Sequence, residues 1–141
     1  MDMITVEDKI AIAELVAHFT RCSDFGDWDG LARLYTADVV TEMEGIAIRY
    51  VGIEQQIEHA RESDRQAEGK NRHYNFNLIV SEQDGDVHAD YAFMNVNAGP
   101  VPMASKIVVT GRQRDTVVKT DAGWKIAHRF VQFDQNVQLD F

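Results

Sequence analysis

The sequence predicts an α+β domain in which one curled antiparallel sheet packs against two or three helices around a single cavity. From Thr5 to about residue 37, apolar side chains recur at helical spacing. From about residue 72 onward, long segments of strand-forming residues follow one another with only short turns between them, as in an antiparallel meander. Helices first and strands later is the order typical of α+β folds.

The length and net charge of the chain predict a single domain and exclude some classes of binding partner. The 141 residues fit one domain over 1–141, with no linker-like stretch and both prolines confined to Gly99–Pro102. Because 14 Lys and Arg stand against 23 Asp and Glu, for a net charge of −9, we expect no nucleic-acid partner and no anionic membrane partner.

Residue usage also bears on compartment and cofactors. The single cysteine, Cys22, excludes an internal disulfide and a cysteine-based zinc site, which favours the reducing cytoplasm. The first residues contain no basic and apolar leader, and no apolar run approaches the ~20 residues of a membrane span. Nucleotide-binding motifs and paired histidines are absent, so we expect neither a cofactor nor a metal.

The first helix is predicted from its cap and its apolar stripe. Thr5 and Asp8 form a capping-box-like start, and Gly26 can take the left-handed conformation that ends a helix. Between them, one face carries Ile12, Leu15, Val16, Phe19 and Cys22.

Two further helices and two short strands follow. Asp27 is an N-cap residue for a second helix that would bury Trp28, Leu31, Ala32 and Tyr35. Short strands are predicted over 39–42 and 46–51, on either side of Gly45. A more polar helix is predicted from 52 to about 67, with Ile53 and Ile57 inward.

Four long strands complete the fold, over 73–81, 87–97, 106–119 and 124–134. The proline-containing segment within 97–105 is a candidate lid over the cavity. The aromatic tail 139–141 would close the pocket or dock on a neighbouring molecule.

One predicted strand has an unusual polar face. In a regular strand His73, Asn75 and Asn77 share one side, and Tyr74, Phe76 and Leu78 share the other. Such a polar row suits either open solvent or a cavity with placed polar groups. The other histidines, including His59 on the polar helix, fit surface or boundary positions.

Two charged residues stand out for their surroundings. Asp24 follows the buried stripe at the C-terminal end of the first helix, where the helix dipole disfavours a carboxylate, so another group can be its partner. A carboxylate paired with a histidine makes that histidine a stronger general base. Arg129 lies between Ala127 and Val131, opposite Ile126, either as a buried counter-ion or as an edge charge.

Several motifs together resemble the SnoaL-like domains. They are Asp24–Asp29, Leu34–Val39, Arg72–Tyr74 with Asn77, Gly111–Asp115, and Gly123–Ile126 with Arg129. They cover nearly the whole chain in the family's order and spacing. The resemblance implies a nuclear-transport-factor-2-like cone, in which a strongly bent antiparallel sheet and helices surround a pocket.

The resemblance also implies a site. In the dehydratase and dehydrochlorinase branch, an Asp at the end of the first helix and a His at the start of the first long strand remove a proton. Asp24 and His73 match these two positions, and Arg129 matches the family's arginine, a candidate for stabilising an anion. Some relatives carry Tyr, Lys or Gln where this chain has Phe19, and Gln113 replaces a frequent Tyr.

These points favour a cofactor-independent lyase or isomerase, similar to a dehydratase, acting on a small, largely apolar, cyclic molecule. The expected catalytic residues are Asp24, His73 and Arg129, and the expected substrate-binding residues are Phe19, Trp28, Asn75, Asn77 and Phe93. The alternative is a non-catalytic subunit of the same fold, for ligand binding or for assembly. We expect a homodimer or homotrimer in either case.

Overall fold

The computed structural model describes residues 4–135, so the tail 139–141 lies outside the described part of the chain. The elements of this part are α1 (Val6–Phe25), α2 (Trp28–Ala32), β1 (Tyr35–Met43), β2 (Arg49–Val51), α3 (Gly52–Gln66), β3 (Asn71–Gln83), β4 (Asp86–Asn97), β5 (Lys106–Thr120) and β6 (Gly123–Phe133). The α+β class and the order of helices and long strands are confirmed.

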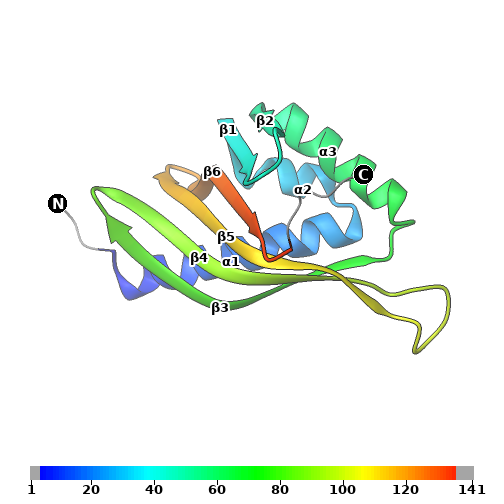
Figure 1. Cartoon of the computed structure of the whole chain (residues 1–141). Coiled ribbons are helices and arrows are strands. Elements are labelled where there is room, and N and C mark those ends of the chain that lie inside the picture. The colour runs from blue at the N-terminus through cyan, green and yellow to red at the C-terminus, as the bar shows by residue number, and fades with distance from the viewer. Residues whose placement is uncertain (1–3, 136–141) are drawn as a thin grey trace.

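The strands form one open sheet in the order β2-β1-β6-β5-β4-β3. The long strands β3 to β6 pair antiparallel in sequence order, which confirms the predicted meander. β1 joins β6 in parallel, a pairing that the sequence did not predict. Figure 1 shows the long strands strongly bent, with the three helices gathered on one side of the sheet.

Helix α1 has the predicted signals at both ends. Thr5 and Asp8 form a capping box, with 3.0 Å between each side-chain oxygen and the other residue's backbone N–H. Gly26 ends the helix at φ +70°, a conformation that costs glycine little because it has no Cβ. Ile12, Leu15 and Val16 are buried, as their spacing predicted.

The second helix is shorter than expected. Asp27 caps it as predicted, but Tyr35 belongs to β1 and pairs with Ile126 of β6. The Leu34 carbonyl already accepts a hydrogen bond of 2.8 Å from the Ile126 N–H. Pairing with a strand about 90 residues later therefore overrides the helical spacing that included Tyr35.

Bulges change which face several side chains occupy. In β6, Val117 faces Ile126 while Thr116 faces His128, so Ala127 is an extra residue. Ile126 and Arg129 consequently lie on the same, buried side of the sheet, which corrects the prediction of opposite faces.

A second bulge lies in β3. The two residues Asn77 and Leu78 stand between the pairs Phe76–Ala92 and Ile79–Asp90, and Asn77 has a φ of +58°. Leu78 therefore packs against the core instead of sharing the exposed face of Phe76, which corrects the regular alternation expected for this strand.

A charged pair lies in the centre of the curved sheet. Arg129 is 4% exposed and donates from Nε to Asp115 Oδ1 at 3.0 Å, and Asp115 is fully buried. The Tyr91 hydroxyl donates to Asp115 Oδ2 at 2.7 Å and accepts from Arg129 Nη2 at 3.1 Å. Of the two alternatives for Arg129, the structure thus has the buried counter-ion.

The segment between β4 and β5 does not cover the cavity. It projects beyond the body of the domain (Figure 1). Met103 within this segment is fully exposed. The lid predicted from Gly99–Pro102 is therefore wrong for this structure: the two prolines shape the connection of a long hairpin. Within residues 4–135, no helix is long and apolar enough to cross a membrane.

Replacing Asp115 by Ala tests the buried pair. We expect a loss of about 3–5 kcal/mol in the free energy of unfolding, because Arg129 would remain buried without its counter-charge. Urea denaturation of this variant and of the double variant Asp115→Leu/Arg129→Met measures the effect. We expect the double variant to recover much of the loss; a single variant as stable as wild type would contradict the assignment.

Candidate active site

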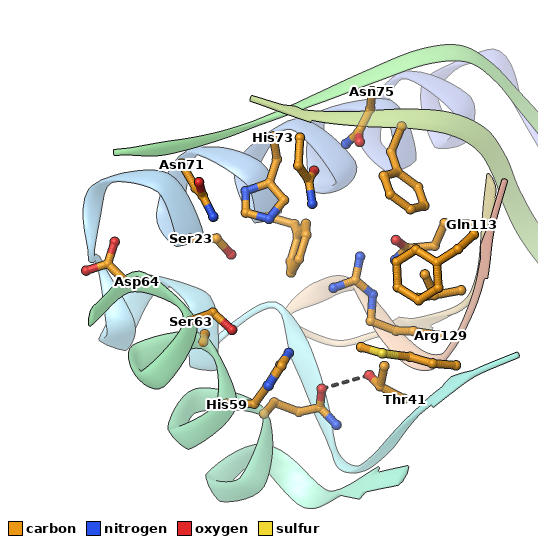
Figure 2. A pocket seen from close by; sticks show the side chains of 18 of the residues that line it. Ser23, Thr41, His59, Ser63, Asp64, Asn71, His73, Asn75, Gln113 and Arg129 are labelled. Carbon is orange, nitrogen blue, oxygen red and sulfur yellow. Dashed lines mark hydrogen bonds between the residues drawn. The ribbon is translucent and has the colours of Figure 1, made fainter. Parts of the chain in front are cut away.

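A cavity of about 370 Å³ lies between the concave side of the sheet and the helices α1 and α3. Figure 2 shows side chains converging on it from these elements. Its apolar end is lined by Phe19, Tyr35, Met43, Phe93, Val131 and Phe133, and the strands add the amides of Asn71, Asn75, Asn95 and Gln113. A mainly apolar space with a few polar groups is typical of a small-molecule site.

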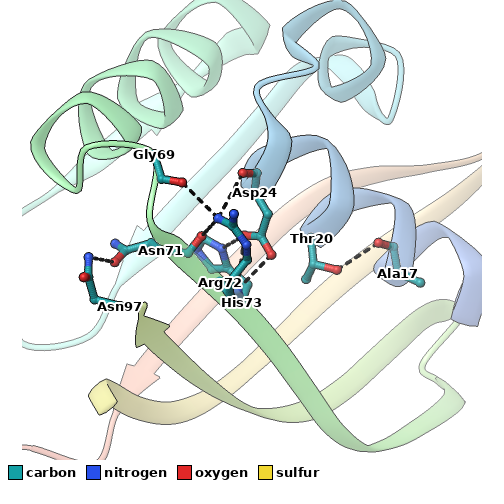
Figure 3. A network of polar contacts seen from close by, with 8 residues as sticks. All are labelled: Ala17, Thr20, Asp24, Gly69, Asn71, Arg72, His73 and Asn97. Carbon is teal, nitrogen blue, oxygen red and sulfur yellow. Dashed lines mark hydrogen bonds and ion pairs between the residues drawn. The ribbon is translucent and has the colours of Figure 1, made fainter. Parts of the chain in front are cut away.

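The end of α1 and the start of β3 meet at one corner of this cavity (Figure 3). Asp24 Oδ1 lies 2.5 Å from His73 Nδ1, and the two carboxylate oxygens accept the His73 backbone N–H at 3.1 and 3.0 Å. The Asp24 side chain is only 8% exposed, whereas that of His73 is 32% exposed and lines the cavity. The buried Asp24 carboxylate therefore fixes the orientation of the His73 ring from the side away from the cavity.

Arg72 stabilises the corner where the end of α1 meets the start of β3. The last turn of α1 contains no basic residue, but Arg72 Nη1 donates to the Asp24 carbonyl at 3.4 Å and to the Gly69 carbonyl at 3.0 Å. A guanidinium at a helix C-terminus complements the negative end of the helix dipole. The cation on β3 thus offsets the unfavourable placement of the Asp24 carboxylate at the end of α1.

This geometry determines which imidazole nitrogen faces a ligand. An ionised carboxylate only accepts hydrogen bonds, so Nδ1 carries the proton that Asp24 accepts. Nε2 then keeps its lone pair on the cavity side, where the His73 and Phe19 rings pack at an interplanar angle of 69° with centroids 6.4 Å apart. The arrangement is suited to a general base whose ring position and tautomer are fixed.

Three of the five predicted substrate-binding residues line the cavity. They are Phe19 on α1, Asn75 on β3 and Phe93 on β4. Phe93 fits because Gly111, its partner on β5, has no side chain; a Cβ there would lie 2.7 Å from the Phe93 ring.

The other two predicted residues lie elsewhere. Trp28 packs against the hydrophobic core beneath Gly26, because the short α2 directs it away from the cavity. Asn77 does not line the cavity, because the bulge in β3 takes it out of the row that contains His73 and Asn75.

Arg129 lines the cavity, but its own network occupies most of its donors. Of the five guanidinium N–H groups, four are accounted for by Asp115, Tyr91 and Tyr35. Its guanidinium carbon lies 3.6 Å from the centre of the Phe19 ring. Burial alone would lower the pKa of Arg129, but the Asp115 carboxylate raises it above its ordinary value, so the side chain stays charged.

The sequence did not predict that His59 lines the cavity. This side chain projects into the cavity from α3, opposite the sheet (Figure 2). Its ring stacks on Tyr50 with centroids 4.2 Å apart. A polar stripe along the helix could have indicated this position. One helix face carries Gln56, His59 and Ser63, which are spaced by three and four residues. In the part of the chain that the structure describes, no three His, Cys, Asp or Glu side chains form a group suited to a metal ion.

Comparisons with known proteins agree with this architecture. The profile of the SnoaL-like domain matches residues 5–130. No curated protein sequence is significantly similar to the chain.

Solved structures share the fold at low sequence identity. The protein Aln2 from a Streptomyces species superimposes with a TM-score of 0.83 at 21% identity, covering 94% of this chain and 95% of that one. A protein of unknown function with a cystatin-like fold from Nostoc punctiforme has a TM-score of 0.81 at 19% identity, with coverages of 98% and 100%. A putative aromatic ring hydroxylase from Novosphingobium aromaticivorans has a TM-score of 0.72 at 24% identity, with coverages of 94% and 93%.

The family match extends over nearly the whole chain and includes both Asp24 and His73. The structural similarities, at these identities, concern the fold alone. The bent six-stranded sheet, the helices on its concave side and the family match lead to one conclusion. The chain belongs to the SnoaL-like domain family and has its cystatin-like, nuclear-transport-factor-2-like fold.

Proposed function

We propose that the protein is a cofactor-independent lyase or isomerase, similar to a dehydratase, that acts on a small, mainly apolar, cyclic molecule. The observation that carries the proposal is the contact of 2.5 Å between His73 Nδ1 and Asp24 Oδ1 beside the cavity. A buried carboxylate that orients a cavity-facing histidine supports general-base catalysis by that histidine.

In the proposed reaction, His73 Nε2 takes a proton from a carbon next to a carbonyl or next to a leaving group. In a lyase, the electrons of the broken C–H bond form a double bond as the leaving group departs with its own electron pair. In an isomerase, His73 returns the proton to a different carbon. Asp24 stabilises the positive charge that the ring gains during the transfer.

The other residues at the cavity have supporting roles. A positioned base typically contributes about 10²–10⁴-fold in rate, so orientation and stabilisation of the developing anion must supply the rest. Asn75 offers an amide beside His73, and Arg129 has one N–H not used by its network. The apolar end around Phe93 would hold the ring of the substrate.

The alternative proposal is a non-catalytic subunit that binds a ligand or assembles with other chains. The feature that favours assembly is the outer face of the sheet, where Tyr74, Phe76 and Ile79 are 47%, 44% and 66% exposed. Self-association through this face, as a homodimer or homotrimer, is compatible with both functions.

Replacing His73 by Ala tests the base. We expect wild-type protein to accelerate deuterium incorporation beside the carbonyl of 1-tetralone in D₂O, followed by NMR, and His73→Ala to lose roughly 10²-fold or more of the acceleration. His18→Ala, at an exposed position of α1, is the matched control and should keep the wild-type rate. Exchange that survives in His73→Ala would contradict the role of His73, and no exchange with wild type would favour the binding subunit.

Replacing Asp24 by Asn tests the orienting carboxylate. The amide keeps the shape but can donate to Nδ1, which allows the other imidazole tautomer. We therefore expect a loss of about 10²-fold or more in the exchange rate with little change in 1-tetralone affinity. The ¹⁵N chemical shifts of His73 should show Nε2 unprotonated in wild type and a mixed tautomer in the variant. An unchanged rate together with an unchanged tautomer would refute the dyad.

Replacing Ile79 by Glu tests self-association. A charge at the most exposed of these three apolar side chains should prevent pairing of two such faces. We expect light scattering to give two or three copies for wild type and one for Ile79→Glu, whereas Ile10→Glu on the exposed side of α1 should leave the mass unchanged. A monomeric wild type would exclude this assembly.

A further inference from the structure

The wall opposite His73 holds a histidine that the proposed dyad does not use. His59 projects from α3 into the cavity, and within residues 4–135 neither of its ring nitrogens has a hydrogen-bond partner (Figure 2). His59 is half-buried, and polar atoms that open onto a cavity commonly bind a ligand or water. His59 is therefore available to bind a polar atom inside the cavity.

Stacking and hydrogen bonds around Tyr50 fix the position of the His59 ring. Tyr50 of β2 stacks on it with an interplanar angle of 24° and a centroid distance of 4.2 Å. The Tyr50 carbonyl accepts Gln56 Nε2 at 3.1 Å, and Gln56 Oε1 accepts the Thr41 hydroxyl at 2.7 Å. This chain of contacts fixes the aromatic platform to α3 and β1, so the nitrogens of His59 present a preorganised edge.

Charge around the cavity favours an uncharged ligand. Burial lowers the pKa of His59, so its imidazole is neutral near pH 7 and has one donor and one acceptor. Arg129 is neutralised by Asp115, and Asp64 adds a negative charge at the α3 wall. Among the described residues the cavity lining thus holds no cation without a counter-charge, and the net charge of −9 on the whole chain also disfavours the binding of an anion.

Other atoms of the cavity indicate that the ligand carries oxygen. Ser23 Oγ and Asn95 Oδ1 are buried without a hydrogen-bond partner in the described part of the chain, and both residues line the cavity near His73. The Ser23 hydroxyl can donate to a ligand oxygen, whereas Asn95 Oδ1 can only accept, as from the hydroxyl of a phenol. Asn95 is the cross-strand neighbour of His73. Purely apolar ligands would leave these atoms unsatisfied.

We infer that His59 donates a hydrogen bond to the oxygen of an uncharged ring ketone or phenol and thereby turns the carbon beside that oxygen toward His73. The cavity of about 370 Å³ is at the lower end of the size range of small-molecule sites, which suits a ligand of two or so fused rings. The orientation of the ligand carbon toward His73 rests on the proposed function, whereas the hydrogen bond from His59 to the ligand oxygen does not.

The two histidines would then have complementary tasks. As His73 takes the proton, negative charge develops on the carbonyl oxygen, where a preorganised N–H is most effective. Phe19 cannot supply this donor from α1, because its side chain has no polar atom. His59 supplies it from the opposite wall, which adds a substrate-contacting residue to the site.

Paired ligands and paired variants test the inference. Binding of 1-tetralone and of tetralin, which differ by one carbonyl oxygen, is measured by NMR titration with wild type, His59→Phe and His59→Gln. Phenylalanine keeps a ring on Tyr50 but has no N–H, whereas glutamine keeps a donor. We expect wild type and His59→Gln to prefer 1-tetralone, and His59→Phe to lose about 5–10-fold in 1-tetralone affinity with unchanged tetralin affinity.

Two outcomes would overturn the inference. One is equal weakening of both ligands in His59→Phe, which would mean that His59 only packs. The other is a wild-type protein without preference for 1-tetralone. Ketone preference through His59 together with absent deuterium exchange would support this inference and contradict the proposed reaction.

Discussion

The buried charge of Arg129 is the constraint around which the concave side of the sheet is built. A guanidinium that is 4% exposed must have a counter-charge and acceptors, and Asp115, Tyr91 and Tyr35 provide them from β5, β4 and β1. The pair therefore ties these strands to β6 in one register. Arg129 also lines the cavity on the side of the sheet, and the Phe19 ring stacks on its guanidinium. Because charged and polar groups occupy this position, hydrophobic side chains do not fill the centre of the domain.

Around this cavity, the functional groups come from walls that are far apart in sequence. Asp24 lies at the end of α1 and His73 near the start of β3, and Arg72 stabilises the junction by donating a hydrogen bond to the Asp24 carbonyl at the end of the helix. His59 comes from α3, which packs against β1 at the other side of the cavity. His73, the proposed proton acceptor, and His59, the proposed donor, thus lie on opposite walls, an arrangement that suits a ligand bridging the space between them.

Irregular backbone positions decide which side chains reach the site. The bulge at Asn77 ends the polar row after Asn75, and the bulge at Ala127 brings Arg129 to the same side as Ile126. Bulges also increase local bending, and the sheet is strongly curved (Figure 1). The irregularities that bend the sheet around the cavity are therefore the ones that make strict alternation fail as a guide to its lining.

The sequence alone was sufficient for the α+β class, the caps and stripe of α1, the four-stranded meander and the family resemblance, which joined Asp24 to His73. These features rest on local propensity, turn chemistry and motif order, all of which are readable along the chain. Only the tertiary structure decided that Tyr35 is in a strand, that Trp28 and Asn77 lie outside the cavity, and that His59 lies within it. Each of these depends on a long-range pairing, a bulge or a facing helix, and such contacts have no local pattern from which to predict them.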